Sequence, residues 1–168
     1  MRLFSLITET VDFITDRINT PESFKVGQDF EKYVEEYLFP KKYYEMIERT
    51  HDYHTNSKNY VEASLNPDFK FRDRITKKEF YVEAKFRTNL YNGKLVWCTD
   101  KQLARYQSIN KQTPVFLILG DSGKATMPEC LSLIPLSKAK YTGLFPSFAD
   151  QFAIVPGLAI SSKALWNR

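Results

Sequence analysis

The sequence lacks several features that define large classes of protein. It has only two cysteines, Cys98 and Cys130, too few for a disulfide framework or a four-thiolate metal site, so we expect both to be buried small hydrophobic residues in a reducing, cytoplasmic setting. The longest apolar runs, such as Val115–Leu119, are far too short to cross a bilayer. The apolar stretch at residues 3–7 is too short for a secretory signal. We therefore expect no membrane partner.

Composition and charge place the chain among ordinary folded domains. Its 168 residues are 43% hydrophobic and 26% charged, which suits a single domain, residues 1–168, with one core. The net charge of +4 is small but unevenly distributed. Residues 1–67 carry 8 basic and 12 acidic side chains, residues 68–111 carry 11 and 5, and residues 112–168 carry 5 and 3. An anionic partner is therefore expected at the middle third.

The N-terminal part has helical patterns. Apolar residues recur at helical spacing over residues 1–20 and predict an amphipathic helix. Thr20 followed by Pro21 is typical of a cap and first turn, so we predict a second helix that Pro40 stops. Glu31 lies beside the apolar stripe of that helix. A carboxylate at the edge of a core needs a partner, because an unpaired buried charge is costly.

Alternating patterns follow. A strand is predicted over residues 44–50, then a polar connection over residues 51–66. Two further segments, residues 68–72 and 80–87, have clear period-two alternation, and the short link at 73–78 predicts an antiparallel hairpin. In that hairpin Asp68, Glu83 and Lys85 share one face.

The remainder completes an α/β domain with a mixed sheet. Thr99 to Gln102 has the form of a capping box and predicts a helix over about 100–110. Residues 114–120 form an apolar run typical of a strand covered on both faces. We predict a turn at 121–123, a strand over 130–136 and a last apolar stretch over 152–160. Helix, three strands, helix and strand is the resulting central order.

The polar face of the hairpin carries the chemical information. Two carboxylates on adjacent strands form an oxygen-rich site for a hard divalent cation, and the lysine places an ammonium beside it. Phosphodiester hydrolysis requires an activated water, neutralised phosphoryl charge and a stabilised leaving oxygen, most of which Mg²⁺ or Mn²⁺ supplies. A lysine can orient or deprotonate the water and stabilise negative charge.

Four motifs in this order resemble the PD-(D/E)XK nuclease superfamily. Pro67-Asp68, fourteen residues and then Glu83-Ala84-Lys85 resemble its defining motif. Gly27 to Glu31 is similar to the GxxxE helix motif of RecB-type members, and Gln102 to Tyr106 to their QxxxY motif. The resemblance covers residues 27–120.

The resemblance implies a fold and a set of functional residues. The fold would be a restriction-endonuclease-like core over about residues 21–120, a mixed central sheet flanked by helices, with an extra helix at 1–20 and a strand and loop extension at 121–168. The cofactor would be Mg²⁺ or Mn²⁺ and the substrate DNA. The implied metal ligands are Glu31, Asp68, Glu83 and the Ala84 carbonyl; the implied catalytic residues are Lys85, Gln102 and Tyr106, the last two positioning a water or phosphate.

Several alternatives remain open at this stage. Basic side chains near the motifs either contact phosphates or form a solvated face; they are Lys70, Arg72, Arg87, Lys101 and Arg105. Asp68-Phe69-Lys70 also reads as Asp-x-Lys, with Asp52 as an earlier acid, but the strand with Lys85 has the cleaner alternation and directly precedes the predicted helix. His51 and His54 have metal-pair spacing but lie in a segment predicted to be a loop.

Two functions from different classes follow. The first is a metal-dependent deoxyribonuclease, and the second is a catalytically inactive nuclease-fold module that binds nucleic acid or protein. An RNA-directed enzyme is a third alternative, for which the sequence offers no RNA-binding motif. A homodimer or a helicase or repair partner remains open.

Overall fold

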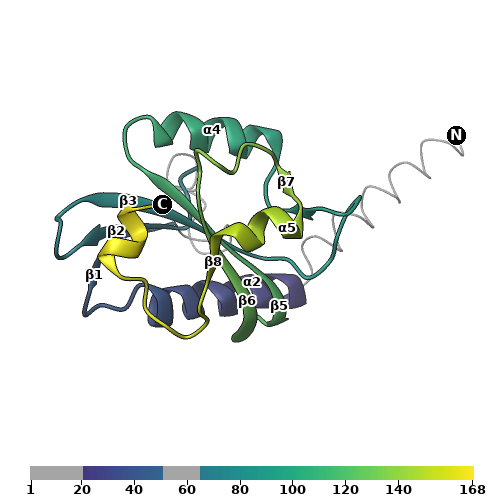
Figure 1. Ribbon diagram of the computed structural model, residues 1–168, viewed down its shortest axis with the longest axis horizontal. Helices are drawn as coiled ribbons and strands as arrows, with labels where there is room; N and C mark the ends of the chain where they lie inside the picture. Colours follow the sequence, from purple (N-terminus) through teal and green to yellow (C-terminus); the bar gives the residue numbers. More distant parts are fainter. Residues whose placement is uncertain (1–20, 51–64) are drawn as a thin grey trace, which may run out of the picture.

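The computed structural model describes residues 21–50 and 65–168 (Figure 1). The helix predicted over 1–20 lies outside these residues, as do His51, Asp52 and His54. The described chain is an α/β fold with a mixed six-stranded central sheet and helices on both of its faces. The α/β class with a mixed sheet, predicted from the sequence, is confirmed.

The described chain begins with a helix that ends where it was predicted to end. Helix α2 (Pro21–Tyr33) runs directly into a π-helical turn, η1 (Val34–Leu38), and the helical stretch ends before Pro40. Phe30 and Leu38 are fully buried, so one face of this helix packs onto the sheet.

The central sheet contains one parallel pair of strands, β3 and β5, and is otherwise antiparallel. The spatial order is β1-β2-β3-β5-β6-β8. Helix α4 (Asp100–Asn110) connects the parallel pair, as such a crossover requires. The strands are β1 (Tyr44–Arg49), β2 (Phe69–Asp73), β3 (Glu79–Phe86), β5 (Val115–Lys124), β6 (Met127–Pro135) and β8 (Ala153–Ile154).

The sheet separates two hydrophobic layers. Strand β5 is buried on both faces: Phe116 and Ile118 belong to the layer that includes α2, while Leu117 and Leu119 belong to the layer that includes α4. Figure 1 shows α2 and α4 on opposite sides of the sheet. A strand covered on both faces reads as a continuous apolar run, and the prediction of such a strand at 114–120 is confirmed in position.

The hairpin of β2 and β3 and the capped helix α4 are also where the sequence placed them. Phe69 pairs with Val82 in antiparallel register. Thr99 Oγ1 accepts the Gln102 N–H at 3.2 Å and Gln102 Oε1 accepts the Thr99 N–H at 3.0 Å, which completes the predicted capping box.

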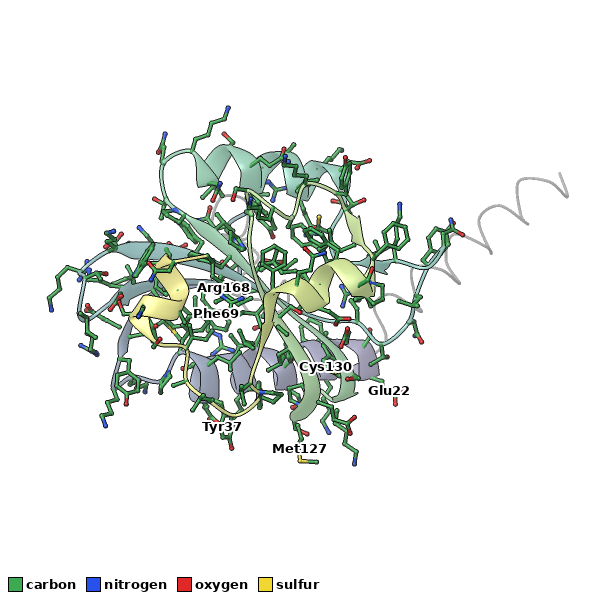
Figure 2. All side chains as sticks on the ribbon, in the orientation of Figure 1. Glu22, Tyr37, Phe69, Met127, Cys130 and Arg168 are labelled. Carbon is green, nitrogen blue, oxygen red and sulfur yellow. The ribbon has the colours of Figure 1, made fainter. Side chains whose placement is uncertain are left out.

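The turn predicted at 121–123 is wrong, because β5 continues through these residues to Lys124 and the chain reverses at 125–126. Bulges at Ser122 and a positive φ at Gly123 let the strand bend without ending. Cys98 is buried as expected, but Cys130 is exposed in the outer part of the hairpin that β5 and β6 form. Figure 2 shows Met127 at the hairpin tip, pointing away from the molecule.

The C-terminal region contains short elements that the sequence did not indicate. A small second sheet forms between β4 (Leu95–Val96) and β7 (Gly143–Leu144). Short helices follow, and elements this short carry too few residues to show a periodic pattern; they are α5 (Pro146–Ala149), η2 (Asp150–Phe152) and α6 (Ser162–Trp166). None of the described helices has the length and apolar character needed to span a membrane.

Asp73, at the end of β2, ties the C-terminal helix to the hairpin. Its buried carboxylate accepts hydrogen bonds from Ser162 Oγ, from Trp166 Nε1 at 2.8 Å and from the Ile75 N–H at 2.9 Å. Burial alone would raise the pKa of Asp73, but the hydrogen bonds from Ser162 and Trp166, with those of the turn, lower it to about 2.

Replacing Asp73 with asparagine is expected to destabilise the fold by on the order of 2 kcal/mol at pH 7, because charge-assisted hydrogen bonds are lost. A depressed pKa stabilises the folded state above the ordinary pKa near 4, and this stabilisation disappears as the pH falls from about 4 to about 2. Urea unfolding at several pH values measures it. The exposed Asp150→Asn is the control, and a difference that did not shrink in acid would contradict this account.

Candidate active site

The end of strand β3 extends beyond its neighbour β2. The ladder between the two strands stops at the pair Phe69 and Val82, so the following residues of β3 pair only with β5. The carboxylate of Asp68 takes the place of the missing strand: its Oδ2 accepts the Ala84 N–H at 2.8 Å. Because N–H and C=O of one residue point to the same side of a strand, the Ala84 carbonyl faces this edge too.

Glu83 is a buried carboxylate with a complete set of partners. Only 1% of its surface is exposed. Its Oε1 lies 2.7 Å from Lys85 Nζ, and its Oε2 accepts the Tyr106 hydroxyl at 3.0 Å and the Asp68 N–H at 3.3 Å. These contacts explain how a charge is tolerated at this depth. Asp68, Glu83 and Lys85 therefore lie together on one face, as the hairpin pattern predicted.

Two carboxyl groups and one ammonium group lie together in the cluster. Burial and then the charge of Glu83 raise the pKa of Asp68 well above its usual range; Lys85 opposes this shift and Glu31 adds to it. Burial lowers the pKa of Lys85, but the charges of Glu83 and Asp68 outweigh it and raise that pKa above its ordinary value. Lys85 is therefore a cation at neutral pH, between carboxylates that repel each other.

A cavity of about 650 Å³ opens between α2 and the end of β3. Glu31, Lys85 and Arg87 line it together with Gly27 and Ala84. A Cβ added at Gly27 would meet no atom within 4 Å, so packing does not require glycine there. Both ends of the GxxxE motif thus face the same space as the lysine.

Glu31 lies beside a cation that the sequence did not single out. Arg49 at the end of β1 lies 3.5 Å from Glu31 Oε2 and 2.8 Å from Glu35 Oε2. A lone arginine at a strand end carries no sequence signal for this role. Glu31 influences the pKa of Asp68, so it lies within electrostatic range of the cluster.

The donor set suits a hard cation, although three carboxylates do not gather around one point. In the part of the chain that is described, no group of three or more His, Cys, Asp or Glu side chains is arranged to hold a metal ion. Asp68, Glu83 and the Ala84 carbonyl are nevertheless adjacent oxygen donors. Mg²⁺ is commonly held by one or two carboxylates, with waters and substrate phosphates completing its shell. Two of the implied ligands and the carbonyl fit that pattern, and Glu31 as a ligand stays a prediction.

The two residues of the QxxxY motif differ in their contacts. Tyr106 is buried and bonded to Glu83, so it belongs to the cluster. The side-chain oxygen of Gln102 closes the capping box instead. A role of Gln102 in positioning a phosphate or water stays a prediction.

The candidate phosphate-binding residues fall into two groups. Lys70 and Arg72 belong to a separate ion-pair network on β1–β3: Glu79 lies 2.8 Å from Lys70 and 2.7 Å from Arg72, and Glu45 lies 3.0 Å from Arg72. This network resembles the solvated face considered as an alternative. It does not include Glu83, whose ion-pair partner is Lys85.

The other three basic residues do not belong to that ion-pair network. Arg87 lines the cavity and donates from Nε to the Val96 carbonyl at 3.0 Å. Arg105, on α4, donates to the Leu65 carbonyl at 3.1 Å, and Lys101 is exposed on the same helix.

A comparison with family models, with curated proteins and with solved structures finds no match to this chain.

Replacing Asp68 with asparagine is expected to stabilise the metal-free protein at pH 7. The carboxamide oxygen can still accept the Ala84 N–H, while the repulsion from Glu83 and the cost of burying a charge disappear. We expect the melting temperature in EDTA to rise by roughly 2–4 °C, the effect of about 1 kcal/mol in a chain of this size.

The pH dependence has a defined sign. A carboxyl whose pKa is raised by folding destabilises the folded state above that pKa, and the penalty is gone below the ordinary value near 4. The difference between variant and wild type should therefore shrink as the pH is lowered to 4. A variant less stable than wild type at pH 7, with Asp150→Asn unchanged, would contradict this electrostatic account.

Proposed function

We propose that this protein is a metal-dependent nuclease with a restriction-endonuclease-like core that hydrolyses phosphodiester bonds of DNA. The observation that carries the proposal is the cluster at the free end of β3. There Asp68, Glu83 and Lys85 lie in direct contact, and Ala84 and Lys85 line an open cavity.

The order of elements supports the same proposal. A helix, three strands, a helix and a strand follow each other as α2, β1, β2, β3, α4 and β5, with the small strand β4 inserted before α4. The resemblance stated from the motifs requires that order, and it also requires the acid before β2 to face the acid on β3. The order of elements agrees with the first requirement, and the register of the hairpin agrees with the second.

The cofactor proposed is Mg²⁺ or Mn²⁺, which Asp68, Glu83 and the Ala84 carbonyl would hold. When bound, such an ion activates a water and neutralises charge on the phosphoryl group. Repulsion between Asp68 and Glu83 favours cation binding, because a cation relieves it.

Lys85 and Tyr106 have different parts in the proposal. Lys85 is protonated at neutral pH, so it acts by orienting water and stabilising negative charge on the phosphate rather than by removing a proton. Tyr106 does not line the cavity, and its bond to Glu83 makes it a positioning residue.

A binding module without turnover is the second candidate. Two observations favour it: Glu31 is paired with Arg49, and no group of three metal-ligating side chains is found in the described ranges 21–50 and 65–168. Calorimetric titration with Mn²⁺ separates the two candidates. The nuclease requires a site that Asp68→Asn abolishes, and no binding of Mn²⁺ favours the module.

Replacing Lys85 with glutamine is expected to reduce cleavage by at least about 100-fold, because a neutral amide stabilises phosphoryl charge much less than an ammonium group does. Glutamine keeps a donor toward Glu83 and so limits the effect on folding. The measurement is the cleavage rate of single-stranded, duplex and branched DNA with Mn²⁺ or Mg²⁺, beside a thermal melt.

The matched control is Lys111→Gln, the same change at the exposed C-terminal cap of α4. We expect it to cleave like wild type. Equal cleavage by Lys85→Gln and wild type would overturn the residue assignment, and no cleavage by wild type on any of the substrates would overturn the nuclease.

Substitutions at Gly27 are expected to separate stability from activity. Gly27→Ala should stabilise the protein by roughly 0.5–1 kcal/mol, because glycine within a helix is less stable than alanine and the space is open. Gly27→Leu should keep the fold and lower cleavage roughly tenfold or more by occupying the cavity that admits the phosphodiester.

Gln107→Leu, an exposed position on α4, is the control for an added leucine. Chemical unfolding and initial cleavage rates are measured on the same preparations. If Gly27→Leu cleaved as fast as wild type, the cavity would not be the substrate entrance.

A further inference from the structure

A second surface with distinct chemistry lies around the small sheet of β4 and β7. Its members are three lysines and three aromatic residues, which we name the lysine–aromatic surface: Lys94, Lys138, Lys140, Tyr91, Tyr141 and Phe145. None of these residues belongs to the four motifs or lines the cavity of the candidate active site.

The aromatic rings of this surface are exposed. Tyr91 is 71% exposed, Tyr141 73% and Phe145 52%. Lys94 Nζ lies 5.1 Å from the centre of the Phe145 ring. Grouped exposed aromatic side chains mark binding surfaces, because isolated ones are common but clusters are not.

Two adjoining cavities give the surface a shape. One of about 440 Å³ is lined by Lys94, Lys138, Lys140, Tyr141 and Phe145, among others. The other, of about 530 Å³, shares Lys94, Lys140 and Tyr141 with it and adds Tyr91. Volumes of this size suit small planar groups.

The charge of the surface favours an anion. Lys138 and Lys140 are exposed, and none of the three lysines forms a salt bridge with an acidic side chain in the described parts of the chain. Asp100 is the acidic residue that lines the second cavity. Three lysines are therefore available at this surface to neutralise the charge of a bound polyanion.

The surface is fixed to the candidate active site. Trp97 donates from Nε1 to the Tyr141 carbonyl at 2.8 Å, and its buried ring lies 6.3 Å from that of Tyr106. Arg87, which lines the site cavity, donates to the Val96 carbonyl on β4. A chain leaving the cavity along Arg87 would therefore meet β4 and Lys94, the residue that precedes β4.

We propose that the lysine–aromatic surface binds a single-stranded segment of nucleic acid, with unpaired bases stacked on Tyr141 and Phe145 and the phosphates contacted by the lysines. Single-strand binding sites combine these two residue types, since any base can stack on a ring while lysines follow the backbone. A duplex keeps its bases stacked on each other and offers no free face to the rings.

The role of this surface in substrate choice rests on the proposed nuclease function. It makes the preferred substrate a nucleic acid with a single-stranded segment beside the cleaved bond. The binding itself does not depend on cleavage and can be measured without it.

The test is fluorescence anisotropy of the full chain in EDTA with labelled dT15, rU15 and a 15-base-pair duplex. We expect single strands to bind more tightly than the duplex, and the comparison of dT15 with rU15 distinguishes DNA from RNA as the source. Tyr141→Ala should weaken binding of the tighter of the two single strands by about tenfold, the loss of one stacked base. A plot of log affinity against log salt concentration has a negative slope, and Lys138→Gln should reduce the magnitude of that slope by about 0.7.

Tyr43→Ala is the matched control, because Tyr43 is also exposed and also has a lysine, Lys42, 5.3 Å from its ring centre. It should bind as wild type does. Three results would each overturn the proposal: duplex bound as tightly as single strands, equal binding by Tyr141→Ala and wild type, or no binding of single strands. The third result would leave a protein as the partner for this surface. If single strands bind but no DNA is cleaved in Mn²⁺, the binding proposal stands and the nuclease is rejected. If duplex is cleaved but single strands do not bind, the nuclease stands and the binding proposal is rejected.

Discussion

The hydrogen bond from the Ala84 N–H to the Asp68 carboxylate joins β2 and β3 at the point where their backbone pairing stops. A side chain that replaces a strand partner is held in one place by the sheet itself. Asp68 is thereby brought against Glu83, which in turn fixes Lys85 and Tyr106. The whole candidate site depends on this termination of one strand before the next.

The cost of that arrangement is electrostatic, and it suggests why the site would take a cation. Burial and then the charge of Glu83 raise the pKa of Asp68, and the nearby Lys85 does not fully offset them. Proteins commonly accept such instability at functional sites. In the proposed nuclease, the surrounding basic residues, Arg87 on the cavity wall and the lysines near β4, would allow a polyanion to approach this cluster.

Much of the frame could be predicted from the sequence because local patterns control it. Strict alternation set the faces of β2 and β3, the capping box set the start of α4, and the apolar run set β5. The prediction of a turn at 121–123 was wrong because bulges and one residue with positive φ let β5 continue through residues that are typical of turns. The short elements after residue 140 pack onto a core they share with distant segments, so no local period marks them.

By itself the sequence determined which residue types face one another on the hairpin, since a period of two leaves little choice once the register is fixed. Only the tertiary structure decided their contacts. In the folded protein, Glu83 contacts Lys85 and Tyr106, and Glu31 pairs with Arg49. The Gln102 side-chain oxygen closes a helix cap. Lys94 lines the same cavity as Lys138 and Lys140. These pairings join segments far apart in the chain, and their distances depend on how helices pack on the sheet, which no local pattern specifies.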